Sequence, residues 1–273
     1  MTDTNPIMLV GEGPALLSLY ADGVAHIRLN RPESANGLNI ELLKSLHEVV
    51  MLVHGDSRVR SVLITGEGKN FCAGGDVHTF LSKGADLPHY IRVATRYLQL
   101  VVAGLIRLNP PVVCAVQGFA AGGGGMGLVC SSDFVVAGES AKFLAGATRV
   151  AMVPDAGVSV TLTQLVGLRR ATEILMLNPT LTAAEAKDMG LITRVVSDDA
   201  LQQQALVLAQ QLAAGAPAAL ANTKRLLWSG IGQGVEAVMP EENNTQAVLS
   251  GMSDALEGLA AVIEKRAPHF TGR

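Results

Sequence analysis

Glycine dominates one stretch near the middle of this chain, and no other feature constrains the fold as strongly. Gly122–Gly125 stand in a row, with Gly118 before them and Gly127 after them. The preceding run Val112–Val116 is typical of a buried strand, and Met126–Val129 suits a buried helix. Glycine destabilises a helix by about 0.5–1 kcal/mol per residue relative to alanine. We therefore predict that the backbone here approaches a ligand closely and presents free N–H groups to an oxygen atom. A tight strand-to-helix turn packed on a neighbouring strand is the alternative.

Two common glycine motifs do not fit this stretch. Gly122, Gly124 and Gly127 have the spacing of the dinucleotide fingerprint G-x-G-x-x-G. That fingerprint begins where its strand ends, whereas Phe119–Ala121 intervene here, and no acidic residue ends a clear second strand about twenty positions later. A phosphate loop is excluded because no Gly-Lys-Ser/Thr follows. A dinucleotide oxidoreductase is therefore the weakest hypothesis.

The composition indicates a globular protein without nucleic-acid or membrane partners. The 273 residues are 49% hydrophobic and 16% charged, which allows one large domain with or without a helical appendage. A net charge of −3 and an aromatic content of 4% argue against nucleic-acid binding. The polar start Met1–Pro6 is unlike a secretory signal, and the central stretch is too rich in glycine for a membrane span. We expect a cytoplasmic protein whose cysteines, Cys72, Cys114 and Cys130, are free thiols, with no metal site.

Strands and helices alternate along the first part of the chain, and helices dominate after Asp198, which indicates an α/β fold. The predicted strands are Leu16–Tyr20, Val24–Leu29, Ser61–Thr65, Val112–Val116, Phe134–Ala137 and Thr193–Val196. The predicted helices are one capped by Asn39 and ending near Val53, a short one opening at Val77, Pro88–Leu108, one in the glycine stretch, Val158–Val166, Arg169–Leu177, Ala183–Asp188, Leu201–Ala214, Ala218–Trp228 and Ser253–Lys265. Phe143 is expected in a loop.

Several motifs together resemble the enoyl-CoA hydratase/isomerase family, also called crotonases, over nearly the whole chain. These motifs are Asn30-Arg31-Pro32 with Asn36 and Leu38 (N-R-P-x-x-x-N-x-L), Phe71–Asp76 (F-C-A-G-x-D), Gly118–Asp133 (glycine loop, helix and Cys-Asp), Pro154–Gly157, Glu185-Ala186 with Gly190-Leu191, and Lys265-Arg266 with Phe270. The resemblance implies a spiral of ββα units over residues 1–200 and a helical trimerisation region over residues 201–273. It also implies a homotrimer or dimer of trimers, an acyl-CoA thioester as ligand, and no cofactor beyond the CoA moiety.

The resemblance also assigns a thioester-binding site. Two backbone N–H groups of the family bind the thioester oxygen and stabilise the enolate, and preorganised donors of this kind are worth about 2.7–4 kcal/mol each. One maps to Gly75. Counting from Gly118 places the other at Gly123, and counting back from Asp133 places it at Gly124, which we adopt because the residues after Asp133 keep that register. The CoA contacts map to Ser34, Ala35, Gly75, Asp76, Val77, His78 and Gly123.

Two positions that carry acid/base glutamates in the hydratases have no titratable side chain in this chain. The first hydratase glutamate maps to Gly127, or to Met126 in the other register, and the second maps to Ala147. Each general acid or base is typically worth about 10²–10⁴-fold in rate. The sequence therefore predicts that simple hydration is not the main reaction.

One carboxylate remains at an informative position. Asp155 stands in Pro-Asp-Ala-Gly where hydratases usually carry glycine, whereas dienoyl-CoA isomerases and the ring isomerases of phenylacetyl-CoA breakdown carry aspartate there. A single carboxylate can remove a proton at one carbon and return it at another, and burial would raise its pKa toward neutrality. Pro-Asp-x-Gly is also an ordinary turn sequence, so the alternative is that Asp155 is only a turn residue.

Three functions stay open from the sequence: an isomerase using Asp155, another crotonase reaction such as hydration or hydrolysis, and a CoA-ester binder without efficient catalysis.

Other charged residues are expected in structural roles. Asp76 and Asp133 are predicted as caps, and the pairs Arg169-Arg170 and Lys224-Arg225 as solvated cations rather than CoA contacts.

Overall fold

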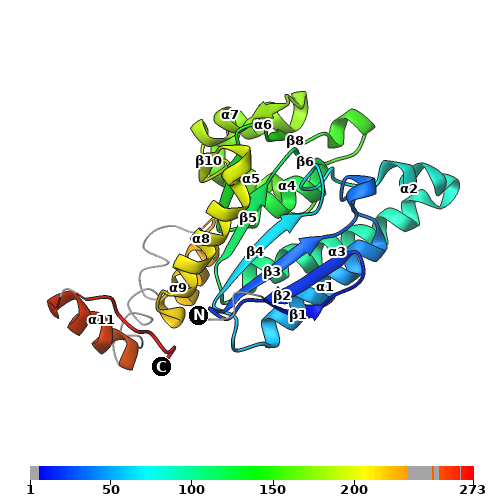
Figure 1. Cartoon of the computed structure of the whole chain (residues 1–273). Coiled ribbons are helices and arrows are strands. Elements are labelled where there is room, and N and C mark those ends of the chain that lie inside the picture. Colours follow the sequence, from blue (N-terminus) through cyan, green and yellow to red (C-terminus); the bar gives the residue numbers. More distant parts are fainter. Residues whose placement is uncertain (1–5, 233–247, 249–251, 265) are drawn as a thin grey trace.

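A mixed seven-stranded sheet forms the centre of the molecule (Figure 1). The computed structural model describes residues 6–232, 248, 252–264 and 266–273. The strand order is β1-β2-β3-β4-β5-β7-β10, antiparallel from β1 to β3 and parallel from β3 onward. The strands are β1 (Ile7–Val10), β2 (Ala15–Leu19), β3 (Val24–Leu29), β4 (Ser61–Gly66), β5 (Val112–Val116), β7 (Phe134–Gly138) and β10 (Arg194–Val196). The prediction of an α/β fold is confirmed.

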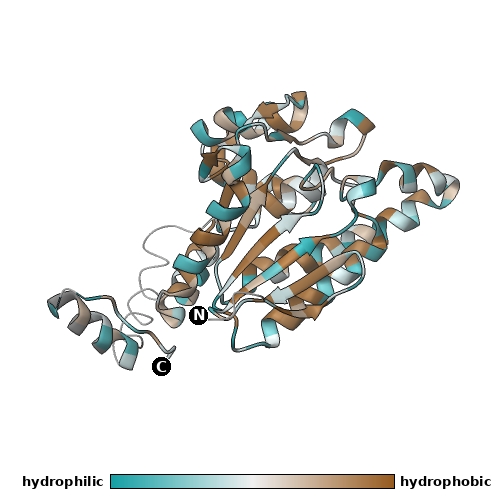
Figure 2. Cartoon of the chain, viewed as in Figure 1, coloured by the Kyte–Doolittle hydropathy of each residue, from teal (hydrophilic) through white to brown (hydrophobic). Residues whose placement is uncertain are grey.

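Helices cover both faces of this sheet, which explains why its central strands are hydrophobic without alternation. Along β4, Val62 and Ile64 join the core under α1 (Ile40–Gly55) and α3 (Leu87–Arg107). Leu63 between them faces α8 (Leu201–Ala213) on the other side. Figure 2 shows hydrophobic residues running along these strands and the helices beside them.

A smaller three-stranded sheet, β6-β8-β9, includes the strand that directly precedes the glycine run Gly122–Gly125. It consists of β6 (Phe119–Ala121), β8 (Lys142–Leu144) and β9 (Leu181–Thr182). The expectation of a loop through Phe143 is wrong, because Phe143 lies in β8, pairs with Ala120 of β6 and is fully buried. Strands of two or three residues are too short to show an alternating pattern, so hydrophobic periodicity could not reveal them.

The remaining helices agree with the predicted ones within a residue or two, except that α4 begins at Gly122, four residues before the apolar run Met126–Val129. They are α2 (Val77–Ser82), α4 (Gly122–Cys130), α5 (Val158–Val166), α6 (Leu168–Leu177), α7 (Ala183–Asp188), α9 (Pro217–Ser229) and α11 (Ser253–Glu264). Asn39 caps α1 as predicted, because its side chain accepts a hydrogen bond from Leu42 N at 2.9 Å. None of the described helices is long and apolar enough to cross a membrane.

The C-terminal helices differ in how they join the sheet. Helix α8 packs directly on it, with Ala205 and Leu208 in a shared core with Val113. Helix α9 buries little more than Lys224, and α11 lies apart from the sheet in Figure 1. The side chains of Leu256, Leu259 and Ile263 on α11 lie outside the described part of the structure.

Candidate functional site

Two glycine-bearing turns meet at the carboxyl ends of β4 and β5. The turn after β4 is held to the start of α4 by backbone hydrogen bonds from Ala121 N to Cys72 O (2.8 Å) and from Cys72 N to Phe119 O (3.0 Å). Gly74 has a left-handed φ of 90°, and a β-carbon added to it would lie 2.6 Å from Ala121 O. Only glycine permits this close approach, so the two turns form one backbone platform.

Gly75 presents a free N–H group on this platform. The carbonyl of Gly74 accepts from Leu38 N at 2.7 Å, and Asp76 N donates to Leu38 O at 3.1 Å. The chain has no cis peptide among its described residues, so the N–H of Gly75 points away from Leu38. Within the described chain, these bonds leave the Gly75 N–H without a backbone acceptor. It is therefore available to a ligand.

The first turn of α4 supplies further free donors. Ala121 is the N-cap of α4, so the N–H groups of Gly122, Gly123 and Gly124 precede the first hydrogen bond inside the helix. The positive end of the helix dipole lies at the same point. Gly124 faces the Gly75 turn, because a β-carbon on it would lie 2.2 Å from Leu38 Cδ1 and 3.8 Å from the carbonyl carbon of Gly74. The two predicted oxyanion donors thus lie on turns in mutual contact.

Asp155 lies against this helix start. Its turn is closed by Val158 N donating to Asp155 O at 3.0 Å, with left-handed φ angles of 53° at Ala156 and 72° at Gly157. A β-carbon added to Gly123 would lie only 1.5 Å from Oδ1 of Asp155. The carboxylate therefore occupies the space beside the first turn of α4.

The environment of Asp155 is unusual for a surface turn. Its Oδ1 is buried and has no hydrogen-bond partner among the described residues. Burial raises the pKa of the Asp155 carboxyl above its ordinary value, only partly opposed by a hydrogen bond from its own backbone N–H. A buried acceptor without a partner is destabilising, and such groups cluster at functional sites.

The two positions of the hydratase glutamates cannot do acid/base work here. A β-carbon on Gly127 would lie 2.5 Å from the β-carbon of Ala156, so the Asp155 turn fills the space beside it. Met126, the other candidate register, is 1% exposed and belongs to the core. Ala147 opens a short 3-10 helix, Ala147–Val150. No described cluster of His, Cys, Asp and Glu could hold a metal ion.

Most of the residues expected to contact CoA are brought together beside Gly75. Arg31 joins them: its guanidinium contacts Ser34 Oγ at 3.3 Å and Asp76 Oδ2 at 3.1 Å. Ala73 N donates to Ala35 O at 3.0 Å, which ties the two loops together. Val77 and His78 are exposed at the start of α2, and Gly123 lies across the platform on α4. Arg31 belongs to the Asn30-Arg31-Pro32 motif, but its link between these loops depends on tertiary contacts that the motif does not predict.

Asp76 caps α2, as predicted, by accepting from Thr79 N at 3.0 Å. Burial alone would raise the pKa of Asp76, but the hydrogen bonds from Thr79 and the Arg31 guanidinium outweigh it and hold the pKa below its ordinary value. Asp76 is thus an ionised structural residue next to Gly75 and not a proton carrier.

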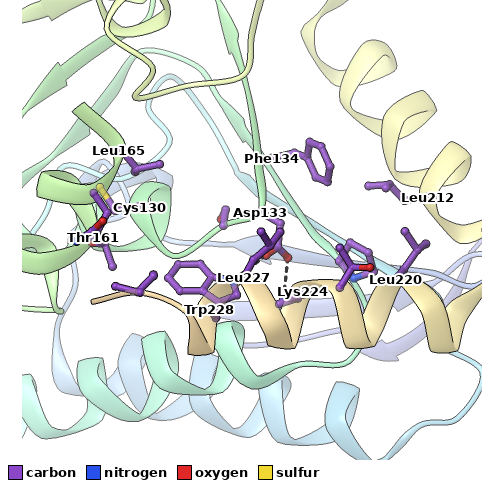
Figure 3. A pocket seen from close by; sticks show the side chains of 15 residues that line it. Cys130, Asp133, Phe134, Thr161, Leu165, Leu212, Leu220, Lys224, Leu227 and Trp228 are labelled. Carbon is purple, nitrogen blue, oxygen red and sulfur yellow. Dashed lines mark hydrogen bonds and ion pairs between the residues drawn. The ribbon is translucent and has the colours of Figure 1, made fainter. Parts of the chain in front are cut away.

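Lys224 and Asp133 form an ion pair just beyond the C-terminal end of α4 (Figure 3). The expectation of a solvated Lys224 is wrong: its Nζ lies 2.8 Å from Asp133 Oδ2 and 2.9 Å from Leu105 O. Burial lowers the pKa of Lys224, opposed by the charge of Asp133. Asp133 is not a helix cap, since it accepts from Val112 N (2.8 Å) and Trp228 Nε1 (3.0 Å). The pair anchors α9 beside a cavity of about 300 Å³ that none of the predicted site residues lines.

Comparison with known proteins agrees with this architecture. A family model described as enoyl-CoA hydratase/isomerase matches residues 20–273. The 1,2-epoxyphenylacetyl-CoA isomerase of Escherichia coli is 33% identical over 94% of this chain and 98% of its own. A probable enoyl-CoA hydratase of Rhodobacter capsulatus is 35% identical over 93% of this chain and 96% of its own. The solved enoyl-CoA hydratase of Mycobacterium smegmatis superposes with a TM-score of 0.88 at 30% identity, covering 95% of this chain and 99% of that one. The chain belongs to the enoyl-CoA hydratase/isomerase, or crotonase, family.

Proposed function

We propose that this protein is an isomerase that shifts a carbon–carbon double bond in an acyl-CoA thioester. The thioester oxygen binds between the N–H groups of Gly75 and Gly124, and Asp155 is the acid/base. The observation that carries the proposal is the Oδ1 atom of Asp155, which is buried without a described partner against the glycines of α4. A carboxylate that served only a turn would direct both of its oxygens to backbone N–H groups or to solvent.

The chemistry follows from these positions. Asp155 takes a proton from a carbon of the acyl chain, and the C–H electron pair becomes part of a conjugated enolate. The negative charge develops on the thioester oxygen, where the two N–H groups and the positive end of the α4 dipole stabilise it. The enolate then takes the same proton back at a different carbon, so the double bond moves and nothing is consumed. A raised carboxyl pKa favours both halves of this transfer near neutral pH.

The rest of the molecule fits this use. The CoA moiety is held by Ser34, Ala35, Gly75, Asp76, Val77, His78 and Gly123, and no other cofactor takes part. The protein acts in the cytoplasm as a homotrimer or a dimer of trimers, which α9 supports because Leu227 leaves 70% of its surface exposed. The E. coli relative is named a 1,2-epoxyphenylacetyl-CoA isomerase, and that name supports isomerisation over hydration.

A direct assay distinguishes the open functions. A purified sample is offered a 3-enoyl-CoA, and formation of the conjugated 2-enoyl-CoA is followed by absorbance; hydration of crotonyl-CoA is measured on the same sample. We expect isomerisation to exceed hydration by at least about 10²-fold, the smallest usual worth of an acid/base group. Fast hydration with no isomerisation would favour a hydratase, and tight binding with neither reaction would favour a CoA-ester binder.

A further inference from the structure

Gly75 has no side chain, yet its backbone does not require glycine. Its φ is not in the left-handed region, in contrast to that of Gly74. The family motif also leaves this position open, since it is the variable residue of F-C-A-G-x-D. Something other than backbone conformation therefore keeps a side chain out of position 75.

The aromatic ring of Phe80 occupies that space. A β-carbon added to Gly75 would lie 2.6 Å from both Cε2 and Cζ of Phe80, and its next neighbour, at 3.7 Å, is Cε1 of the same ring. Phe80 lies on α2, one turn after the Asp76 cap, and its N–H donates to Asp76 O at 2.9 Å. The ring thus folds back over the residue that carries the free N–H.

A second aromatic residue braces Phe80. Tyr90, near the start of α3, meets the Phe80 ring edge-on, with centroids 6.0 Å apart at 63°. The Tyr90 hydroxyl accepts from Ile40 N at 3.2 Å, and Lys83 Nζ lies 4.8 Å from the centre of its ring. Ile40 follows Leu38 by two residues, and Leu38 is the bridge partner of Gly75. The contacts therefore run from Gly75 through Phe80, Tyr90 and Ile40 back to Leu38, which is paired with Gly75.

We infer that Phe80 is a positioning residue of the thioester site: its ring, packed on Gly75 and braced by Tyr90, fixes the direction of the Gly75 N–H. The bridge to Leu38 holds the peptide through its hydrogen bonds, and the ring packs where a β-carbon of Gly75 would stand. Since a donor stabilises an oxyanion only when it is oriented beforehand, loss of the ring weakens polarisation of the thioester without removing the donor. This inference rests on the proposed thioester site.

The polarising power of the site can be measured without turnover. 4-Dimethylaminocinnamoyl-CoA is a coloured thioester with no hydrogen on its γ-carbon, so Asp155 cannot isomerise it, and its absorption moves to the red when donors polarise its carbonyl. We expect a red shift with the unmodified protein and a smaller one with Phe80→Ala. Leu81→Ala is the matched control, because Leu81 is on the same short helix and is 76% exposed; it should retain the full shift.

Turnover of a 3-enoyl-CoA provides the second readout. For Phe80→Ala we expect kcat to fall about 10–100-fold, the usual effect of a displaced group, while KM stays within about threefold. Gly75→Ala should also lose activity because its methyl group meets the ring. The double variant Gly75→Ala/Phe80→Ala should be more active than Gly75→Ala, since the new methyl fills the vacated space, and the two losses should not add.

Three results separate the possible failures. An unchanged red shift and kcat in folded Phe80→Ala would overturn the inference while leaving the thioester site in place, as would strictly additive losses in the double variant. Absence of any red shift in the unmodified protein would contradict the thioester site itself. If circular dichroism shows that Phe80→Ala is unfolded, Phe80→Leu replaces it, because leucine keeps apolar volume but not the flat ring.

Discussion

Oδ1 of Asp155 lies so close to Gly123 that a β-carbon on the glycine would stand 1.5 Å from it. Any larger residue at position 123, the second residue of α4, would collide with the carboxylate. We expect Gly123→Ala to displace Asp155 and lower isomerisation by about 10²-fold, as a misplacement of roughly 1 Å does. Steady-state kinetics with a 3-enoyl-CoA measures the loss. Gly55→Ala is the control, since a β-carbon there meets nothing within 4 Å; equal activity of Gly123→Ala and the control would refute the coupling.

The same turn explains why hydration should be slow. Ala156 fills the space beside Gly127. One of the two hydratase acid/base positions therefore has no carboxylate and no room for a side chain. We expect crotonyl-CoA hydration well below the roughly 10 s⁻¹ of an ordinary enzyme. A coupled assay of hydrated product checks it. A turnover at that ordinary level would show that a different pair of groups activates water.

Burial of Asp155 should make the protein less stable as the pH rises. The pKa of Asp155 in the folded state is raised above its ordinary value of 3.8. Between pH 3.8 and that raised pKa, the folded protein therefore binds more protons than the unfolded chain. The free energy of unfolding falls as the pH rises through this range. Asp155→Asn removes the buried charge. We expect its thermal midpoint at pH 7 to exceed that of the parent by a few degrees, with the difference disappearing below pH 3.8. A variant less stable than the parent at pH 7 would mean that the carboxylate is favourably paired.

His26 should show the opposite dependence on pH. Burial, assisted by the Arg28 charge, lowers the pKa of His26 to about 4 from an ordinary 6.5, and its Nε2 lies 2.9 Å from Thr65 Oγ1. The unfolded chain takes up this proton first, so His26 contributes stability above pH 6.5 that is lost as the pH falls toward 4. We expect His26→Gln to flatten the loss of stability over that range in urea unfolding. An unchanged slope would show that His26 is not neutral in the fold.

The order of the elements and the position of the glycine platform could be predicted from the sequence because both rest on local signals. Val112–Val116 and the glycines after it specify a strand and a helix start without reference to the rest of the chain. The contact of Phe80 with Gly75 could not be predicted, because it depends on how α2 folds back. The burial of Lys224 was missed because its partner, Asp133, is distant in the chain. The Phe80 contact and the Lys224 ion pair both depend on packing between distant segments, about which hydrophobic periodicity carries no information.

The C-terminal helices should join subunits together. Leu227 is 70% exposed on α9, and Leu226 and Trp228 beside it are only partly buried in the single chain. Apolar surface of this kind is usually covered in a symmetric assembly. Sedimentation at micromolar concentration should give the mass of a trimer or hexamer, and Leu227→Glu should shift it toward the monomer. A monomeric parent protein would contradict this prediction.

The measurement that bears most directly on the proposed mechanism is hydrogen exchange in Asp155→Asn. The substitution keeps the shape of the side chain and removes the base, while the N–H groups of Gly75 and Gly124 remain. Affinity for a 3-enoyl-CoA should therefore be nearly unchanged, and isomerisation should fall by about 10²–10⁴-fold. Deuterium uptake from D₂O at the α- or γ-carbon, followed by mass spectrometry, should fall in parallel. Full exchange and full turnover in a folded Asp155→Asn would show that Asp155 is only a turn residue and that another group moves the proton.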